Sequence, residues 1–479
     1  MNVDDLPFSS VTQLGSLLRR REISSTELTQ LYFERLDTIG RHLNAVVTLT
    51  EEVAMAEAAL ADSEILRGLD RGPLHGIPYG LKDIVSVAGV ATSWGAEPFR
   101  DRVLPHDATV VRRLRNAGAV HVAKLATIEF AGGMGYDHPE ATFTGATANP
   151  WDVSTWAGGS STGPSAAVAA GIVPFAIGSD TSGSILLPAA WTGTAGLRAT
   201  YGRVSRFGAM TLCWTLDRLG PICRTAEDCG LVLEAISGVD PQDTSTLKAT
   251  YRYQPQRPKG GFRIGAIAGA AKGVEPAIAA NYERSLALLS TIGHVEEVAL
   301  PEFPYDAVID VISAAEAFAA FDDFLASGRT MELAAHKARS HRLAGALLPA
   351  HDYIRAQRIR RHIATSVNHL LSGFDAVVAP TIGAFAAGID ENFEYMLPGA
   401  FPQPINYAGV LTGSPTVSIA SGFSNNGLPT SIQFAGARLA ENSVLSAASA
   451  LEDLLGLQSR RPPTEAAHHA TTDGNVRKA

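Results

Sequence analysis

Hydrophobic and polar positions alternate along the chain between helix-like and strand-like patterns, which predicts an α/β protein. The first 65 residues predict helices, because a capping box at Ser24–Glu27 precedes apolar positions at helical spacing. Residues 72–87 form short apolar runs broken by Gly and Pro, which indicates buried strands and tight turns. Residues 107–130 predict a helix followed by a strand, and the alternation returns in the second half of the chain.

Residues 156–208 are unusually rich in small side chains. They begin with a Gly/Ser loop that leads into an Ala-rich helix, and continue with a strand and a second Gly/Ser loop. No internal repeat or interdomain linker interrupts the chain. The pattern therefore predicts one large domain over residues 1–457, in which 1–65 is the helical segment and 72–208 is the core segment with the candidate catalytic residues. The polar residues 458–479 predict a flexible C-terminal tail.

Composition and charge limit the classes of protein that remain. The chain has 479 residues, 46% of them hydrophobic, and a formal net charge of −9; the apolar content excludes a disordered protein. The acidic balance argues against binding to nucleic acid or to an anionic membrane, since both require a basic surface. No run reaches the ~18 apolar residues that span a bilayer, and the N-terminus lacks a secretion-signal pattern. We therefore expect a cytoplasmic globular protein with no nucleic-acid or membrane partner.

The three cysteines predict neither a disulfide framework nor a metal site. Cys213, Cys223 and Cys229 are spaced C-x9-C-x5-C without a nearby His. An odd number of cysteines in a long chain is typical of reduced thiols that behave as small buried apolar groups. We expect no bound metal.

The first Gly/Ser loop contains a G-x-S-x-G sequence centred on Ser161. This sequence is typical of the nucleophile turn of α/β-hydrolases, which also requires a preceding strand and a later catalytic His. Residues 151–157 are a poor strand sequence, and no His stands out as a partner. A flexible loop without function is the other interpretation of this segment taken alone.

The second Gly/Ser loop places Ser184 after a turn of small residues. The backbone N–H groups of residues 181–184 can converge there on an anion, as an oxyanion hole requires. A serine hydroxyl is a weak nucleophile unless a base activates it. Lysine is scarce in this chain, and only Lys82 and Lys124 precede residue 200.

Lys82 lies in an apolar sequence that predicts the end of a buried strand. Burial without a counter-ion lowers the pKa of a lysine and leaves its amine able to accept a proton. The alternative is a structural ion pair between Lys82 and its neighbour Asp83. The residue pattern alone leaves both interpretations open.

Together these segments resemble the amidase signature family of serine hydrolases. The resemblance is carried by GGSSTGPSAAVAAG and GSDTSGS, by the lysine segment GPLHGIPYGLKDI, and by LDRLGPICRTAEDC further along the chain. It extends over roughly residues 10–455. The resemblance implies a single large α/β domain with a mixed β-sheet flanked by helices on both faces.

The resemblance also implies a Ser–Ser–Lys mechanism that needs no metal or organic cofactor. Ser184 matches the nucleophile, Ser160 matches the bridging serine whose peptide bond is cis in the family, and Lys82 matches the base. The implied oxyanion hole consists of the backbone amides of Thr181, Ser182, Gly183 and Ser184. Ser161 is then expected to support the loop through hydrogen bonds.

Two positions depart from the family pattern: Ser182 replaces a common Gly, and Leu186 replaces a common Arg. Loss of that guanidinium removes a group suited to binding a carboxylate, which predicts a neutral and rather apolar substrate. Residues 132–138 also contain a short insertion. We expect Met134, Tyr136 and Leu186 to contact the substrate, although a variable surface loop is the alternative for this insertion.

These observations predict a stand-alone amidase for neutral, hydrophobic or aryl amides, with carbamates (urethanes) and esters as further substrates. On this interpretation the protein is a monomer or homodimer whose partner is a small-molecule amide or carbamate. One alternative is the glutaminase (A) subunit of a tRNA-dependent amidotransferase, which YGRVSRFGAM and RTAEDCGLVLEAISG resemble. Another is a non-catalytic binding protein on an amidase scaffold, against which the intact Lys82, Ser160 and Ser184 argue.

Overall fold

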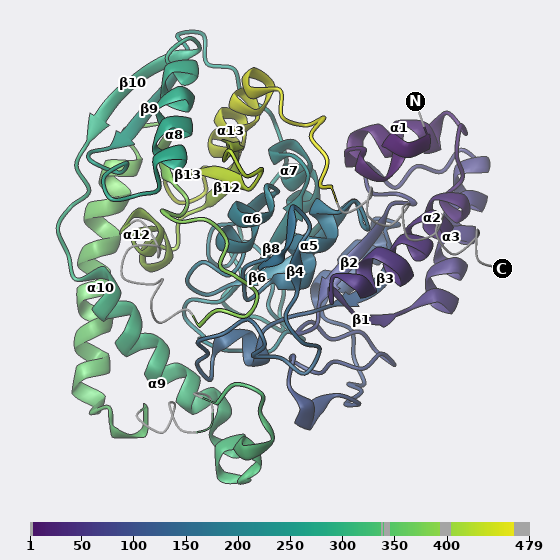
Figure 1. Ribbon diagram of the computed structural model, residues 1–479, viewed down its shortest axis with the longest axis horizontal. Coiled ribbons are helices and arrows are strands. Elements are labelled where there is room, and N and C mark those ends of the chain that lie inside the picture. The colour runs from purple at the N-terminus through teal and green to yellow at the C-terminus, as the bar shows by residue number, and fades with distance from the viewer. Residues whose placement is uncertain (1–2, 337–338, 340–344, 393–403, 464–479) are drawn as a thin grey trace.

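The centre of the molecule is one mixed β-sheet of 11 strands (Figure 1). The computed structural model describes residues 3–336, 339, 345–392 and 404–463. The strands of the sheet, in their spatial order, are β1 (Val46–Leu49), β3 (Val120–Leu125), β2 (Pro78–Lys82), β6 (Phe175–Asp180), β8 (Arg218–Cys223), β7 (Ala195–Arg198), β12 (Thr416–Phe423), β13 (Pro429–Ala435), β11 (Ala376–Pro380), β9 (Phe262–Ile267) and β10 (Gly293–Val298).

Parallel pairs occur in two places in the sheet. Strand β2 runs parallel to both β3 and β6, and β9 runs parallel to both β10 and β11. The other neighbours pair in the antiparallel direction. A short ribbon of β4 (Ala148–Asn149) and β5 (Asp152–Trp156) lies outside this sheet. The predicted mixed sheet is therefore confirmed.

Helices lie on both faces of the sheet (Figure 1). Helices α9 and α10 pack against each other beside the sheet, on the left in Figure 1. The α-helices are α1 (Val11–Arg19), α2 (Ser25–Arg35), α3 (Glu51–Leu66), α4 (Thr109–Asn116), α5 (Thr162–Ala169), α6 (Leu186–Thr192), α7 (Ala226–Ile236), α8 (Pro276–Leu289), α9 (Tyr305–Ala326), α10 (Ala350–Leu371), α12 (Pro404–Thr412) and α13 (Glu441–Leu455). This arrangement confirms the predicted fold class.

The N-terminal segment follows its predicted pattern with one addition. The capping box before α2 forms, since the Ser24 hydroxyl accepts the N–H of Glu27 at 3.1 Å and the Glu27 carboxylate accepts the N–H of Ser24 at 2.8 Å. The segment 1–65 also contributes strand β1, which its helical pattern did not predict.

Residues 152–156 form β5 although their sequence is a poor strand pattern, because β4 pairs with them.

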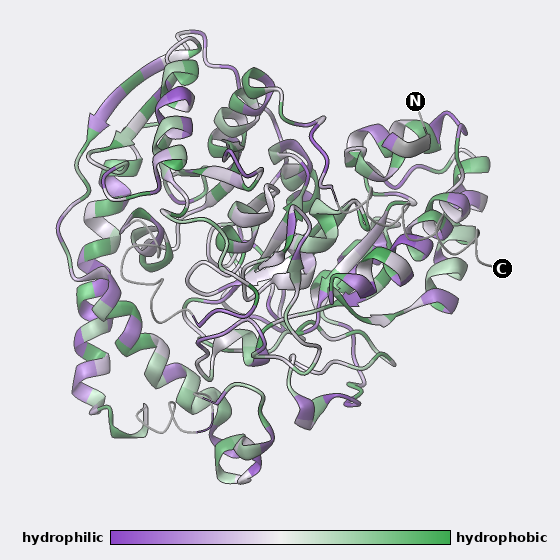
Figure 2. Ribbon diagram, in the orientation of Figure 1, coloured by the Kyte–Doolittle hydropathy of each residue, from purple (hydrophilic) through white to green (hydrophobic). Residues whose placement is uncertain are grey.

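The core is built from apolar side chains on both faces of the interior strands. Every residue of β2 and of β6 is buried, as expected for parallel strands covered on both sides. The edge strand β10 alternates exposed and partly buried positions and carries exposed Glu296 and Glu297, so it is hydrophilic in Figure 2. Removing apolar surface from water therefore stabilises the middle of the sheet most strongly.

Cys213, Cys223 and Cys229 are all buried free thiols. Burial raises the pKa of each thiol, which keeps it in the protonated form. Among the described residues, no helix is both long enough and apolar enough to cross a membrane.

A buried ion pair ties α13 to the segment that follows β7. The Nε and Nη2 atoms of Arg203 lie 3.1 and 2.8 Å from the two carboxylate oxygens of Glu441. The backbone N–H of Thr200 also donates to this carboxylate at 3.1 Å. Both charged side chains are almost completely buried. Removing one partner would leave the other charge desolvated and unpaired, which is costly.

We expect Glu441→Gln to lower the free energy of unfolding by about 3 kcal/mol, because the amide keeps the shape but leaves the Arg203 charge unpaired. Urea denaturation followed by circular dichroism measures this change. The matched control is Glu332→Gln, since Glu332 pairs with Arg329 on the surface at 2.8 Å. The control should lose much less stability than Glu441→Gln, because water screens an exposed ion pair. Equal losses in the two variants would contradict the assigned role of the buried pair.

Candidate active site

Two neighbouring parallel strands in the interior of the sheet end together and define the site. Lys82 is the last residue of β2 and Asp180 is the last residue of β6. The register pairs Leu81 with Ile177, so the two strand ends lie at the same edge of the sheet. The loop between β5 and α5 brings Ser160 to this edge. Polar side chains from separate segments therefore meet where the buried strands stop.

The amine of Lys82 contacts two serine hydroxyls. Its Nζ atom lies 2.7 Å from the Oγ of Ser160 and 2.9 Å from the Oγ of Ser179. The Gly159–Ser160 peptide bond is cis. The structure thus brings together two of the three predicted catalytic residues in direct hydrogen-bond contact.

Ser184 lies in the turn between β6 and α6, next to the loop that carries Ser160. The N–H of Ser161 donates to the carbonyl oxygen of Ser184 at 3.2 Å, so the two Gly/Ser loops lie against each other. The Ser161 hydroxyl is itself buried and donates to the carbonyl oxygen of Ser179 at 3.1 Å. Ser161 therefore joins the loops to β6, which fits a supporting role and not that of the central serine in a nucleophile turn.

Burial determines the protonation behaviour of Lys82. Its side chain is completely buried, and this desolvation lowers its pKa to about 7 although the carboxylates of Asp180 and Asp217 act to raise it. Asp83 pairs with Lys124 instead, at 2.7 Å between Nζ and Oδ1. The alternative of a Lys82–Asp83 ion pair is therefore wrong. A substantial neutral fraction of Lys82 exists near neutral pH and can accept a proton.

The carboxylate of Asp180 shapes the turn that contains the predicted oxyanion hole. Its Oδ1 atom accepts the N–H of Gly183 at 2.9 Å, and its Oδ2 atom accepts the N–H of Ile185 at 2.8 Å. Gly183 has φ +136°, a conformation that side-chain-bearing residues rarely adopt. The backbone N–H of Gly183, one of the four donors of the predicted oxyanion hole, thus already donates to the carboxylate of Asp180.

Residues distant in the sequence hold the outside of the same turn. The Nη1 atom of Arg198 lies 3.3 Å from the Asp180 carboxylate and 2.6 Å from the side-chain oxygen of Asn406. The side-chain amide of Asn406 in turn donates to the carbonyl oxygen of Ser182 at 2.9 Å. The backbone at Ser182 is therefore anchored although its residue type departs from the family pattern.

A small pocket lies beside Ser179, whose hydroxyl contacts Lys82 at 2.9 Å. Ser179 and Thr181 form part of its wall, together with Asp217 and the apolar side chains of Met210 and Leu212. The hydroxyl of Thr181 donates to the Oδ1 atom of Asp217 at 2.7 Å. This pocket is therefore continuous with the loop that carries the predicted oxyanion hole.

None of the three predicted substrate contacts lines the pocket beside Ser179. Met134 and Leu186 are fully buried within the apolar core, and neither lines the pocket beside Ser179. Tyr136 is partly buried and packs edge-on against Trp156, with ring centroids 6.2 Å apart. A side chain that packs inside the apolar core, as Leu186 does, gives no information on whether the substrate is charged. The substitution at Leu186 is therefore no evidence for a neutral substrate.

A larger hollow lies at the opposite end of the strands. Its wall includes Trp151, Arg224 and Glu452, and none of the predicted site residues. Arg224 directly follows the end of β8, and β8 runs antiparallel to β6, so this hollow is separated from the site by the length of a strand. Its size alone does not connect it with the candidate chemistry.

The sequence analysis missed Ser179, Asp217 and Asn406 as parts of this site. Ser179 and Asp217 lie inside the motif segments GSDTSGS and LDRLGPICRTAEDC, where a strand ending or beginning at the site could have drawn attention to them. Asn406 lies more than 200 residues from its partner Ser182, and no local pattern points to it. Within the described ranges, no cluster of His, Cys, Asp and Glu is arranged to hold a metal ion.

Comparisons with known proteins extend these observations. A family model described as Amidase matches residues 27–445. The A subunit of the glutamyl-tRNA(Gln) amidotransferase from Moorella thermoacetica is 36% identical over 96% of this chain and 99% of its own length. Further bacterial relatives at 32–35% identity carry the same name.

Solved structures share the fold. The native peptide amidase from Stenotrophomonas maltophilia superimposes with a TM-score of 0.83 at 31% identity, covering 95% of this chain and 98% of that one. The A subunit of the glutamyl-tRNA(Gln) amidotransferase from Thermotoga maritima superimposes with a TM-score of 0.76 at 28% identity, covering 94% and 95%.

The named relatives contradict two expectations from the sequence. The first is the stand-alone amidase for neutral or aryl amides and carbamates, because the full-length relatives are amidotransferase subunits. The second is a small molecule as the partner without nucleic acid, because the relatives are named for a transfer to glutamyl-tRNA(Gln). The physical error was to exclude nucleic acid from the net charge of −9, because the charge of one chain says nothing about the surface of a second protein. The family model, the identities and the shared fold together show that this chain belongs to the amidase (amidase signature) family.

Proposed function

We propose that this chain is the glutaminase (A) subunit of a tRNA-dependent amidotransferase, which releases ammonia from glutamine. The observation that carries the proposal is the near-complete overlap, at 36% identity, with a relative named as that subunit. The contact of 2.7 Å between Lys82 and Ser160 supplies the chemical means for amide cleavage. On this proposal residues 1–457 form one catalytic domain.

In this mechanism Ser184 is the nucleophile, Ser160 relays protons and Lys82 is the base. Ser184 attacks the side-chain amide carbon of glutamine while its proton passes to Ser160 and the Ser160 proton passes to neutral Lys82. The tetrahedral intermediate collapses to a glutamyl ester of Ser184, and the proton returns through Ser160 to the departing ammonia. Water then attacks the ester by the same relay, releasing glutamate and restoring the Ser184 hydroxyl.

Backbone amides in the turn before α6 are proposed to stabilise the negative oxygen of the intermediate. The predicted donors are the amides of Thr181, Ser182, Gly183 and Ser184. Because Asp180 already accepts the N–H of Gly183 at 2.9 Å, this donor would have to be shared with the substrate oxygen. Asn406 supports the arrangement by holding the carbonyl group of Ser182.

The proposed partners follow from the names of the relatives. An enzyme component that releases ammonia requires a second protein that receives it and presents the glutamyl-tRNA acceptor. The acidic balance of this chain agrees with such a division, because another protein of the assembly can supply the basic surface for tRNA.

We expect this chain, isolated with its copurifying subunits, to release ammonia from glutamine, and Ser184→Ala to abolish the release. A coupled glutamate dehydrogenase assay measures the ammonia. Neutral aryl amides serve as the comparison substrates at equal concentration. Turnover of the aryl amides with no turnover of glutamine would contradict the proposal, as would activity that survives in Ser184→Ala.

The rate should rise with pH through about 7, because Lys82 accepts a proton only when neutral and its pKa lies at about 7. Below that pH the amine is increasingly protonated and the rate falls. The profile of kcat/KM for glutamine between about pH 5.5 and about 8.5 measures this dependence. A rate that falls as pH rises through 7 would exclude Lys82 as the base.

Two adjacent serines allow a matched test of the relay. We expect Ser160→Ala to lower kcat at least ~100-fold, because it interrupts the proposed proton path to Lys82. Ser161→Ala removes a hydroxyl of the same turn that contacts Ser179 and not Lys82, so its loss should stay below ~10-fold. Similar losses in both variants would show that the loop structure, and not the relay, was damaged.

A further inference from the structure

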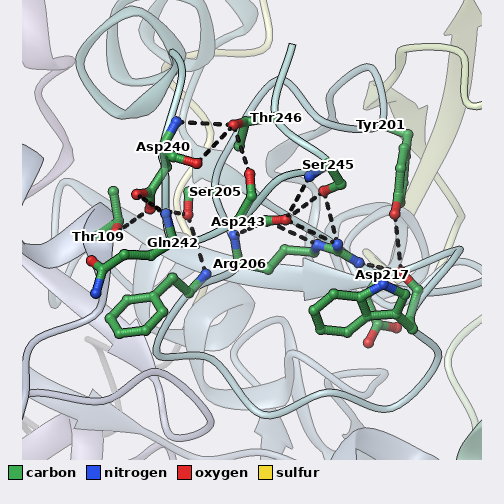
Figure 3. Close-up of polar contacts among 12 residues, drawn as sticks. Thr109, Tyr201, Ser205, Arg206, Asp217, Asp240, Gln242, Asp243, Ser245 and Thr246 are labelled. Carbon is green, nitrogen blue, oxygen red and sulfur yellow. Dashed lines mark hydrogen bonds and ion pairs between the residues drawn. The ribbon is translucent and has the colours of Figure 1, made fainter.

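The segment between β7 and β8 connects the site to a buried polar network. Figure 3 shows this network, in which Arg206 lies beside the carboxylate of Asp243. The Nε of Arg206 lies 3.2 Å from Asp243, and its guanidinium carbon lies 4.6 Å from the Trp214 ring centroid. Tyr201 donates its hydroxyl to the carbonyl oxygen of Trp214 at 3.0 Å. The segment is therefore held firmly on this side.

The same segment is held on its other side by the helical pair α9 and α10. The carboxylate of Glu316 accepts the N–H and the hydroxyl of Thr215, both at 2.8 Å. Arg360 donates to the hydroxyl and the carbonyl oxygen of Thr215, both at 2.9 Å. Position 217 thus follows a stretch of backbone with little freedom to move.

Asp217 joins this rigid segment to the turn with the proposed oxyanion hole. Its Oδ1 atom accepts the Thr181 hydroxyl at 2.7 Å. Its Oδ2 atom accepts the N–H groups of Leu212 and Cys213 at 2.7 and 2.9 Å. The carboxylate therefore connects Thr181 to a fixed support, in the wall of the pocket beside Ser179.

The charges near Lys82 distinguish Asp217 from the other nearby carboxylate. Asp180 pairs with Arg198 and accepts several backbone amides, so its charge is largely compensated. Asp217 instead accepts hydrogen bonds from neutral donors, namely one hydroxyl and two backbone amides. Asp217 lines the same pocket as Ser179, whose hydroxyl lies 2.9 Å from Lys82, and both carboxylates act to raise the pKa of Lys82.

Other titratable groups also face Asp217. Arg206 and Arg218 line the same pocket, and the Cys213 thiol is protonated because burial raises its pKa. Burial raises the pKa of Asp217 itself to about 6, and Arg206 acts against this rise. Asp217 is thus ionised in the pH range in which neutral Lys82 is present.

We propose that Asp217 is a positioning residue of the reaction, which fixes Thr181 in the oxyanion turn and stabilises the ammonium that forms when Lys82 accepts the proton. The second part follows from simple electrostatics, since a fixed negative charge favours a positive charge that develops nearby. This inference rests on the roles proposed above for Lys82 and Ser184. It goes beyond them because Asp217 acts on the reaction through Thr181 and through its charge, and not as a member of the proton relay.

The test measures the labelling rate of Ser184 by a fluorophosphonate as a function of pH, which reports nucleophile activation without depending on the amide substrate. Asp217→Asn should lower the maximal labelling rate about ten-fold. It should also move the midpoint of the rate increase to lower pH, because loss of the negative charge favours neutral Lys82. Asp217→Glu retains the charge, so its midpoint should stay near that of the wild type although its maximal rate falls.

Asp240→Asn is the matched control. Asp240 accepts the hydroxyls of Thr109 and Ser205, both at 2.5 Å, and the N–H of Gln242 at 2.9 Å, so its hydrogen-bond donors resemble those of Asp217 (Figure 3). Unlike Asp217, it does not line the pocket beside Ser179. Thermal melting verifies that each variant is folded, and Asp240→Asn should leave the midpoint unchanged.

Thr181→Val provides a second test that leaves Asp217 in place. It removes the contact between the carboxylate and the turn, and should lower the maximal labelling rate several-fold. A profile of Asp217→Asn that coincides with wild type, or an unchanged maximal rate in Thr181→Val, overturns the inference while leaving the proposed function intact. If Ser184 is not labelled in the wild type, both the proposed function and the role of Asp217 are overturned. This outcome differs from the two above, which overturn only the role of Asp217.

Discussion

The burial of Lys82 away from any directly paired carboxylate is the constraint on which the site depends. A charged ammonium is expensive to remove from water, whereas a neutral amine between hydroxyls is not. The strand ends of β2 and β6 enclose the amine, and Ser160 and Ser179 satisfy it at 2.7 and 2.9 Å. The adjacent Asp83 is kept away because Lys124 neutralises it. The fold thereby holds a lysine that can exchange a proton near neutral pH.

The carboxylates around this lysine are engaged by other groups. Asp180 organises the turn before α6 through backbone amides and is balanced by Arg198. Asp217 holds Thr181 against a segment that α9 and α10 also hold. Negative charge therefore lies close enough to influence Lys82 but is bound to other donors. Because the carboxylates of Asp180 and Asp217 are bonded to other donors, the amine of Lys82 stays available as a proton acceptor in a site that also contains anionic groups.

Much of this arrangement was predictable from local sequence. The apolar run of β2 predicts that Lys82 is buried at a strand end, and the small residues before Ser184 predict a turn with exposed amides. The substrate was not predictable in the same way. Met134 and Leu186 were treated as substrate contacts from their sequence positions, but both are enclosed in the core. Whether a side chain faces a pocket or the core depends on packing partners that a local pattern does not contain.

The sequence by itself determined the alternation of helices and strands, the burial of the Lys82 strand, and the serine and lysine segments, because hydrophobic periodicity and turn residues act over a few neighbouring positions. Only the tertiary structure decided that Asp83 pairs with Lys124, that Asn406 holds the turn at Ser182, and that Asp217 reaches Thr181. The last two contacts join segments 224 and 36 residues apart. Their partners are selected by strand order and by the cost of leaving buried polar groups unsatisfied, and both arise only when the whole chain is packed.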